Sequence, residues 1–236
     1  MTRHCATDRG VALLAALIVL AVVSAMGMGL ALTSSLEPTA AANFEAGRAA
    51  RLAAEAGVAV AAHELAGLSD WNAILSGLTV SAVLDHGPVE VDLPDGSRAG
   101  LDALTARATC GRPGACLEAD RRAFSAARPW GPNNPSWLVF GHSRLDLLVP
   151  GGSGLPPIVV VVWAGDDPAE LDGNPFADSG VGPGGERRPG GCVLAVRAEA
   201  FGPRFSHAAV LATVARREPG PGCGQGARLV SMRGLN

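Results

Sequence analysis

The residues of this chain that could take part in chemistry are few, and the densest group is acidic. Between positions 166 and 178, in GDDPAELDGNPFAD, six side chains offer oxygen atoms: Asp166, Asp167, Glu170, Asp172, Asn174 and Asp178. Calcium prefers such ligands. However, their spacing departs from that of an EF-hand loop, and two prolines in the segment indicate a rigid surface loop. We therefore expect a solvated acidic loop, with a calcium site as the alternative.

The histidines offer little for catalysis, because most of them are scattered through regions of different predicted structure. Those beyond the N-terminal region are His63, His86, His142 and His207. Ser206 and His207 are adjacent, and in a strand their side chains would point to opposite faces. The sequence contains no nucleophile elbow, phosphate-binding loop or zinc-ligand spacing. We predict that the protein is not an enzyme and needs no cofactor or metal.

Cysteine usage and charge indicate the compartment and the class of partner. The chain has 236 residues and five cysteines, of which Cys5 precedes a long apolar stretch and four follow it. If the later part is exported, those four could form two disulfides. No C-x-x-C pair occurs, which gives no support to a zinc ribbon or a thioredoxin-like site. The formal net charge of −3 gives no reason to expect nucleic-acid binding.

The apolar stretch covers residues 11–32, and no charged side chain occurs between Arg9 and Glu37. As a helix it would reach ~33 Å, enough to cross a bilayer. It is longer than the apolar region of about 7–15 residues in a secretory signal peptide. The triplet at 29–31 is a loose match to a signal-peptidase site. Three interpretations remain open: a discarded signal peptide, an uncleaved anchor, or a segment that processing retains.

Residues 41–68 are rich in alanine, the best helix former, and their polar side chains recur at spacings of three and four. We expect one helix from the apolar stretch to about Leu68. Pro38 could bend it, and Ser34 or Ser35 could cap a break. A lone helix of this length needs partners along its sides.

The junction before the apolar stretch resembles a class III signal. A short polar leader ends in Gly10, and the apolar run begins at once with Val11. Three later segments are similar to parts of PilX-type minor pilins of the type IV pilus. They are AARLAAEAG, VVVWAGDDPAELDGNPFAD and VLAVRAEAFGPRFSHAAVLATVAR. The resemblance is absent or unreadable between about residues 70 and 155.

This resemblance implies an α+β fold, with a long N-terminal hydrophobic helix packed on an antiparallel sheet. It also implies that a prepilin peptidase cuts after Gly10 and methylates Val11. The protein would then lie in the inner membrane with its C-terminal domain outside, and would join other pilins or pseudopilins in a filament at the cell surface. Cys5 would be lost with the leader.

One departure concerns Ala15, the fifth residue of the expected mature chain, where most pilins carry a glutamate. Its absence fits a subunit at the tip or in the initiating complex. The first alternative is a GspK-like tip pseudopilin of type II secretion, and the second is a single-pass anchored binding domain. Close helix contact in the membrane would favour the small residues of this segment, namely Ala21, Ser24, Ala25, Gly27 and Gly29.

The chain therefore divides into a leader (1–10), a transmembrane and assembly helix (11–68) and an extracytoplasmic β-rich domain (69–236). A turn at 94–97 predicts a hairpin with arms on both sides. Further strands are expected at 137–149, 158–163, 193–201, 206–217 and 227–233. Four cysteines are expected to form two disulfides, one closing a small loop and one tying the last strand to the sheet: Cys110–Cys116 and Cys192–Cys223.

Overall fold

The computed structural model describes residues 7–86, 89–149, 151–179, 189–217 and 223–235. The chain forms two compact units, Met1–Glu45 and Ala46–Asn236. The first contains the N-terminal part of helix α1. The second contains the rest of this helix and all of the described strands. The boundary between the two compact units therefore lies inside helix α1, which ends at Gly67.

Helix α1 spans Thr7–Gly67 without interruption, although Pro38 lies inside it. The expectation of one helix ending near Leu68 is confirmed, and there is no break at Ser34. The helix begins at Thr7, so its first four residues precede the expected cleavage point between Gly10 and Val11. Alanine-rich sequence favours this continuity, because alanine has the highest intrinsic helix propensity.

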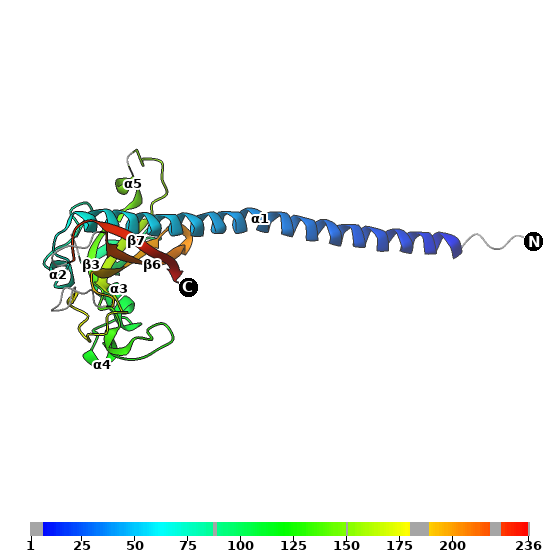
Figure 1. Ribbon diagram of the computed structural model, residues 1–236. Coiled ribbons are helices and arrows are strands. Elements are labelled where there is room, and N and C mark those ends of the chain that lie inside the picture. Colours follow the sequence, from blue (N-terminus) through cyan, green and yellow to red (C-terminus); the bar gives the residue numbers. More distant parts are fainter. Residues whose placement is uncertain (1–6, 87–88, 150, 180–188, 218–222, 236) are drawn as a thin grey trace, which may run out of the picture. The chain divides into compact units, whose positions relative to one another are not determined.

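A five-stranded sheet forms the centre of the second unit (Figure 1). Its strands follow one another in the order of the sequence, and each is antiparallel to the next: β3 Leu138–Arg144, β4 Val159–Asp166, β5 Val193–Phe201, β6 His207–Arg216 and β7 Ala227–Leu235. The fold class is thus α+β, with a long N-terminal helix and an antiparallel sheet. The predicted hairpin of β5 and β6 is confirmed, with Phe201 opposite His207.

One face of the sheet packs against the second half of α1. In this core the helix contributes mainly small residues at helical spacing: Ala50, Ala53, Ala54, Val58, Ala61 and Leu65. The sheet contributes alternate residues, including Val160, Val162, Val196, Ala198, Val210 and Ala212. Small side chains let the helix approach the sheet closely. In Figure 1 the cyan part of α1 runs along the sheet.

Gly57 lies where the helix approaches the sheet closely. A Cβ atom at this position would lie 2.6 Å from Val160 Cγ1 and 3.1 Å from Val162 Cγ2. Both valines are fully buried. The last residue of the AARLAAEAG segment therefore has a packing role, since any side chain there would collide with β4.

The opposite face of the sheet is covered by α3 (Leu101–Cys110) and neighbouring loops. Val159, Val161 and Trp163 of β4 are buried there against Leu101 and Leu104. The indole nitrogen of Trp163 donates a hydrogen bond to Thr105 Oγ1 at 2.9 Å. Every residue of β4 is buried, and the prediction of a buried strand at 158–163 is confirmed for residues 159–163.

The C-terminal end of α1 is closed by side chains from elsewhere in the chain. Arg216, at the end of β6, is almost fully buried and donates hydrogen bonds to the carbonyl oxygens of Leu68 (2.6 Å) and Ser69 (3.0 Å). Its guanidinium carbon lies 4.0 Å from the centre of a Trp71 ring, and the Trp71 indole donates to Leu65 O. The last carbonyls of a helix lack partners within it, so these contacts fix the helix end to the sheet.

Two sequence predictions were wrong in extent. The first hairpin has arms of only three residues, β1 Glu90–Asp92 and β2 Arg98–Gly100, and its expected second arm continues as helix α3. Leu101, Leu104 and Ala108 share one buried face at helical spacing, which the alternating interpretation overlooked. The strand expected at 137–149 ends at Arg144, and one helical turn, α5 Leu145–Leu148, follows.

Two further short α-helices and two 3-10 turns complete the described elements. They are α2 Asn72–Leu75, α4 Glu118–Arg121, η1 Gly131–Asn133 and η2 Pro203–Phe205. The loop after α2 is fastened to α1 by the Glu64 carboxylate, which accepts hydrogen bonds from the Ser81 hydroxyl and from the Ala82 backbone at 2.6 Å. These contacts hold the chain beside the sheet as it leaves the helix.

Candidate functional site

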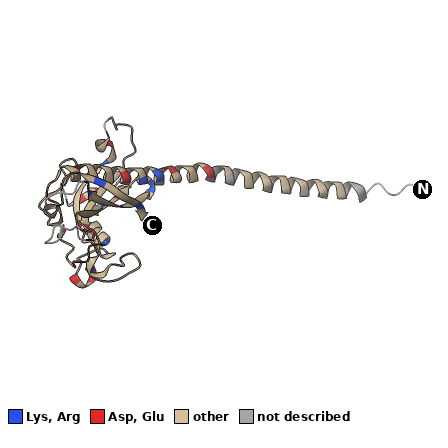
Figure 2. Ribbon diagram, in the orientation of Figure 1, with Lys and Arg blue, Asp and Glu red and all other residues tan. Residues whose placement is uncertain are grey.

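The first candidate site is the apolar segment of α1. Residues Gly10–Leu30 are the one stretch within the described chain that is long and apolar enough to cross a membrane as a helix. None of it is buried by other residues, and large side chains such as Met28 and Leu30 are mostly exposed. Figure 2 shows no charged residue along this segment. Such a surface needs an apolar environment, and a membrane-anchoring segment meets that need.

The residues expected to matter for processing and assembly all lie on this helix. Gly10, Val11 and Ala15 are helical and exposed, and the space around Gly10 is open. Gly27 and Gly29 also have nothing within 4 Å of an added Cβ atom, and Ala21, Ala25 and Gly29 recur every four residues. Residues four apart share one helix face, so the small residues form a stripe that another helix could approach closely.

The predicted disulfides are both present. Cys110 and Cys116 are joined with an S–S distance of 2.04 Å, and close a short loop after α3. Cys192 and Cys223 are joined across 31 residues and connect the segment before β7 to the start of β5. Cys5 lies outside the described residues.

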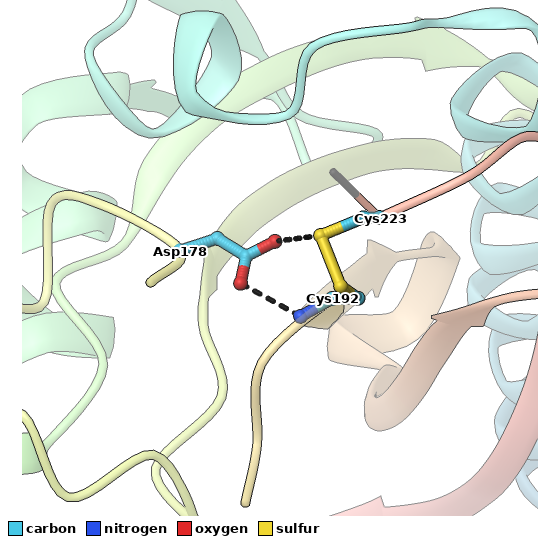
Figure 3. A group of neighbouring side chains, drawn as sticks. All are labelled: Asp178, Cys192 and Cys223. Carbon is cyan, nitrogen blue, oxygen red and sulfur yellow. Dashed lines mark hydrogen bonds between the residues drawn. A yellow bond between two sulfur atoms is a disulfide. The ribbon is translucent and has the colours of Figure 1, made fainter. Parts of the chain in front are cut away.

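A carboxylate supports the second disulfide (Figure 3). Asp178 Oδ1 accepts a hydrogen bond from the Cys192 backbone N–H at 2.7 Å, and its Oδ2 lies 3.5 Å from Cys223 Sγ. Within the described part of the chain, these three residues are the one group of His, Cys, Asp or Glu whose ligand atoms lie close enough together to hold a metal. Because both sulfurs are in the disulfide, neither is a thiolate, the form that binds metals.

The expectation of a solvated acidic loop is wrong for three of its members. Asp166, Glu170 and Asp178 are all buried, whereas Asp172 and Asn174 are exposed. Asp166 continues the inward alternation of β4 to the strand end, and the loop then folds back over it. No three acidic oxygens among the described residues lie close enough together to share a cation. The calcium alternative therefore has no group of three such carboxylates to support it in the part of the chain that the structure describes.

Burial changes the protonation of this acidic group. The pKa of Asp166 is raised to about 9. Desolvation is the largest cause, and repulsion from Glu170 is the next. Desolvation and then the charge of Asp178 raise the pKa of Glu170 to about 7. The two carboxyl groups share a hydrogen bond, and Glu170 also accepts one from the Ser179 backbone at 2.9 Å. At neutral pH Asp166 is thus a protonated donor, which removes the cost of a second buried charge.

The histidines do not form one group, although His86 follows Asp85, which pairs with His142 in an isolated bridge. His63 and His86 are exposed, and His142 is buried in β3, where desolvation lowers its pKa. His207 begins β6, and its Nε2 lies 3.0 Å from Glu199 Oε2. Glu199 also accepts hydrogen bonds from Arg197.

Sequence reasoning missed the Glu199 group. Although burial acts to raise the pKa of Glu199, its hydrogen bond with His207 and the Arg197 charge keep it below its usual value. The signal was available, because Arg197, Glu199 and His207 face the same side of paired strands.

Comparison with known protein families, with characterised proteins and with solved structures found no match to this chain.

Proposed function

We propose that the protein is a minor pilin similar to the PilX type, a structural subunit that takes part in the assembly of a type IV pilus. One observation carries the proposal: the exposed apolar segment continues without a break into a helical segment that packs on an antiparallel sheet. A discarded signal peptide would need no such continuity.

In this proposal a prepilin peptidase removes residues 1–10 and methylates the new amino terminus at Val11. The apolar helix then holds the subunit in the inner membrane with the disulfide-bonded domain outside. When the subunit enters a filament, the same helix packs against neighbouring pilins, and the stripe of small residues at Ala21, Ala25 and Gly29 allows close contact. The role is structural and requires no catalytic residue.

Ala15 favours a special place for the subunit within the filament. A glutamate at this position would need a compensating positive charge inside an apolar helix bundle. A chain with alanine at this position brings no negative charge into the bundle and makes no such charge pair. We therefore place the subunit at the tip or in the initiating complex, where it would occur in few copies. The GspK-like role in type II secretion shares this feature and remains the alternative assembly.

Processing can be tested with a pair of glycine variants in the native host. An added side chain at either Gly10 or Gly27 meets open space in this structure, so neither change should disturb the fold. Gly10→Val should block cleavage, keep the chain at full length and remove it from sheared surface filaments. Gly27→Ala should leave cleavage intact.

The two assembly systems are separated by the fraction in which the protein occurs. Recovery with sheared pili, lost in a strain without the prepilin peptidase, supports the pilus role. Recovery only with the type II secretion apparatus supports the GspK-like role. A full-length chain in wild-type cells contradicts both roles and leaves an anchored domain. Cleavage that does not depend on the peptidase also contradicts both roles.

A further inference from the structure

A depression of about 480 Å³ lies beside helix α3 and the Cys110–Cys116 loop. Its lining is mainly apolar and includes Ala106, Trp137 and Phe176. Sites for small ligands typically have a volume of ~300–1,000 Å³, mostly apolar walls and a few polar groups. The depression has this character, and none of the roles described above uses it.

Arg121 contributes the positive charge in this depression and differs from the arginines around it. Arg112 pairs with Asp120, Arg122 lies 3.4 Å from Glu118, and Arg128 donates to backbone oxygens. Within the described ranges the Arg121 guanidinium has no hydrogen-bond acceptor and no ion-pair partner, and its Nε is buried. Its guanidinium carbon lies 5.7 Å from the centre of the Phe176 ring.

The hydroxyl groups that line the depression also differ in whether they have a hydrogen-bond partner. Thr105 accepts a hydrogen bond from the Trp163 indole, and Thr109 accepts one from the Trp137 backbone N–H at 3.2 Å. Ser136 is 4 % exposed, and its Oγ has no partner among the residues that the structure describes. Buried donors without acceptors cost free energy, which a bound acceptor would recover.

We propose that this depression binds a small ligand that carries a carboxylate on an apolar body. The carboxylate would accept hydrogen bonds from the Arg121 guanidinium, whose planar donors match two carboxylate oxygens. Ser136 Oγ would donate a further hydrogen bond. The apolar body would lie against Phe176 and Trp137. Asp102, exposed at the first turn of α3, also lines the depression, and its negative charge would disfavour an anionic group placed beside it.

This site is independent of the filament role and can be tested on the full-length protein in detergent. The probe is 3-phenylpropanoate, and its matched neutral analogue is 3-phenylpropanamide, which enters micelles at least as readily. Binding is followed by tryptophan fluorescence, because Trp137 lines the depression, and by saturation-transfer NMR. We expect saturable binding of the carboxylate that is at least tenfold tighter than that of the amide.

Two variants locate the site. Arg121→Gln should weaken binding of 3-phenylpropanoate at least tenfold, and Arg107→Gln, an exposed position on α3 outside the depression, should leave it unchanged. Circular dichroism checks that both variants are folded. If Arg121→Gln does not fold, the comparison of 3-phenylpropanoate with 3-phenylpropanamide on the unaltered protein still tests whether the site prefers a carboxylate.

Equal affinity for the carboxylate and the amide would overturn the proposal. So would unchanged binding by a folded Arg121→Gln protein. Inorganic phosphate provides a third arm, because displacement of the probe at equal concentration would show a general anion site and contradict the assignment to carboxylates.

Discussion

Substitution of Gly57 by alanine tests the packing of α1 on the sheet. In an exposed helix this change would stabilise the protein, because alanine has the higher helix propensity by ~1 kcal/mol. Here the new methyl group would lie 2.6 Å from Val160 Cγ1, well inside the ordinary carbon–carbon contact distance of about 3.5–4.0 Å. Gly47 is the matched control, since it lies in the same helix and an added Cβ atom there has nothing within 4 Å.

The structure indicates that the collision cannot be relieved cheaply. Val160 is fully buried, and its strand β4 is hydrogen-bonded to β3 on one side and β5 on the other. Overpacking of a core costs about 1–3 kcal/mol. With the propensity gain subtracted, we expect Gly57→Ala to destabilise the second unit by about 0–2 kcal/mol. Gly47→Ala should stabilise it by about 1 kcal/mol.

The assay is thermal unfolding of the full-length protein in detergent, followed by near-ultraviolet circular dichroism of its tryptophans. One kcal/mol corresponds to about 2–4 °C in a domain of this size. Gly57→Ala should therefore lower Tm by up to about 8 °C, and Gly47→Ala should raise it by about 2–4 °C. If Gly57→Ala raises Tm as much as Gly47→Ala does, the close contact between helix and sheet does not exist.

Three further changes test the helix end, the acidic group and the disulfides. Arg216→Lys keeps the charge but loses the planar donors that close α1, and should reduce the free energy of unfolding in urea by about 2–3 kcal/mol. The folded pKa values of Asp166 and Glu170 are raised, so their contribution to stability is full below the unfolded values near pH 4 and falls as pH rises through about 7 and 9. Asp166→Asn should therefore flatten the decline of Tm between pH 5 and 9, and exposed Asp172→Asn should not; equal slopes in both variants would contradict the assignment. Loop-closure entropy predicts that Cys192→Ser, whose bridge spans 31 residues, lowers the free energy of unfolding by about 4 kcal/mol. Cys116→Ser, whose bridge spans 6, should lower it by about 2 kcal/mol. The reverse order in urea unfolding would contradict the loop-closure argument.

The parts of the fold that could be predicted from the sequence depend on local periodicity. The alanine-rich segment with polar residues at spacings of three and four predicted the helix to its end, and the apolar run at 158–163 predicted a strand buried on both faces. The pairing of Cys192 with Cys223 followed from the hairpin between them. The helix and strand patterns extend over a few turns of helix or a single strand, so neighbouring residues alone determine them, and the hairpin joins strands that are adjacent in the sequence.

The parts that could not be predicted depend on contacts between distant segments. Leu101 and Leu104 form a helix face only because Val161 and Trp163 lie opposite them. The burial of Asp166 and Arg216 had a weak signal, because each continues the inward alternation of its strand beyond the apolar residues. Nothing local shows that Arg216 meets the end of a helix 148 residues earlier. Charged residues that end an inward-facing series therefore mark positions where a partner should be sought.

The most direct test of the filament role is the mass and N-terminal sequence of the mature protein from its own host. The proposal predicts a chain that begins with N-methylated Val11, with the apolar helix retained and Cys5 removed. A chain that begins at residue 1 or 2 would contradict it and leave an uncleaved anchor. A start near Leu32 would also contradict it, because the apolar segment would then be a discarded signal peptide.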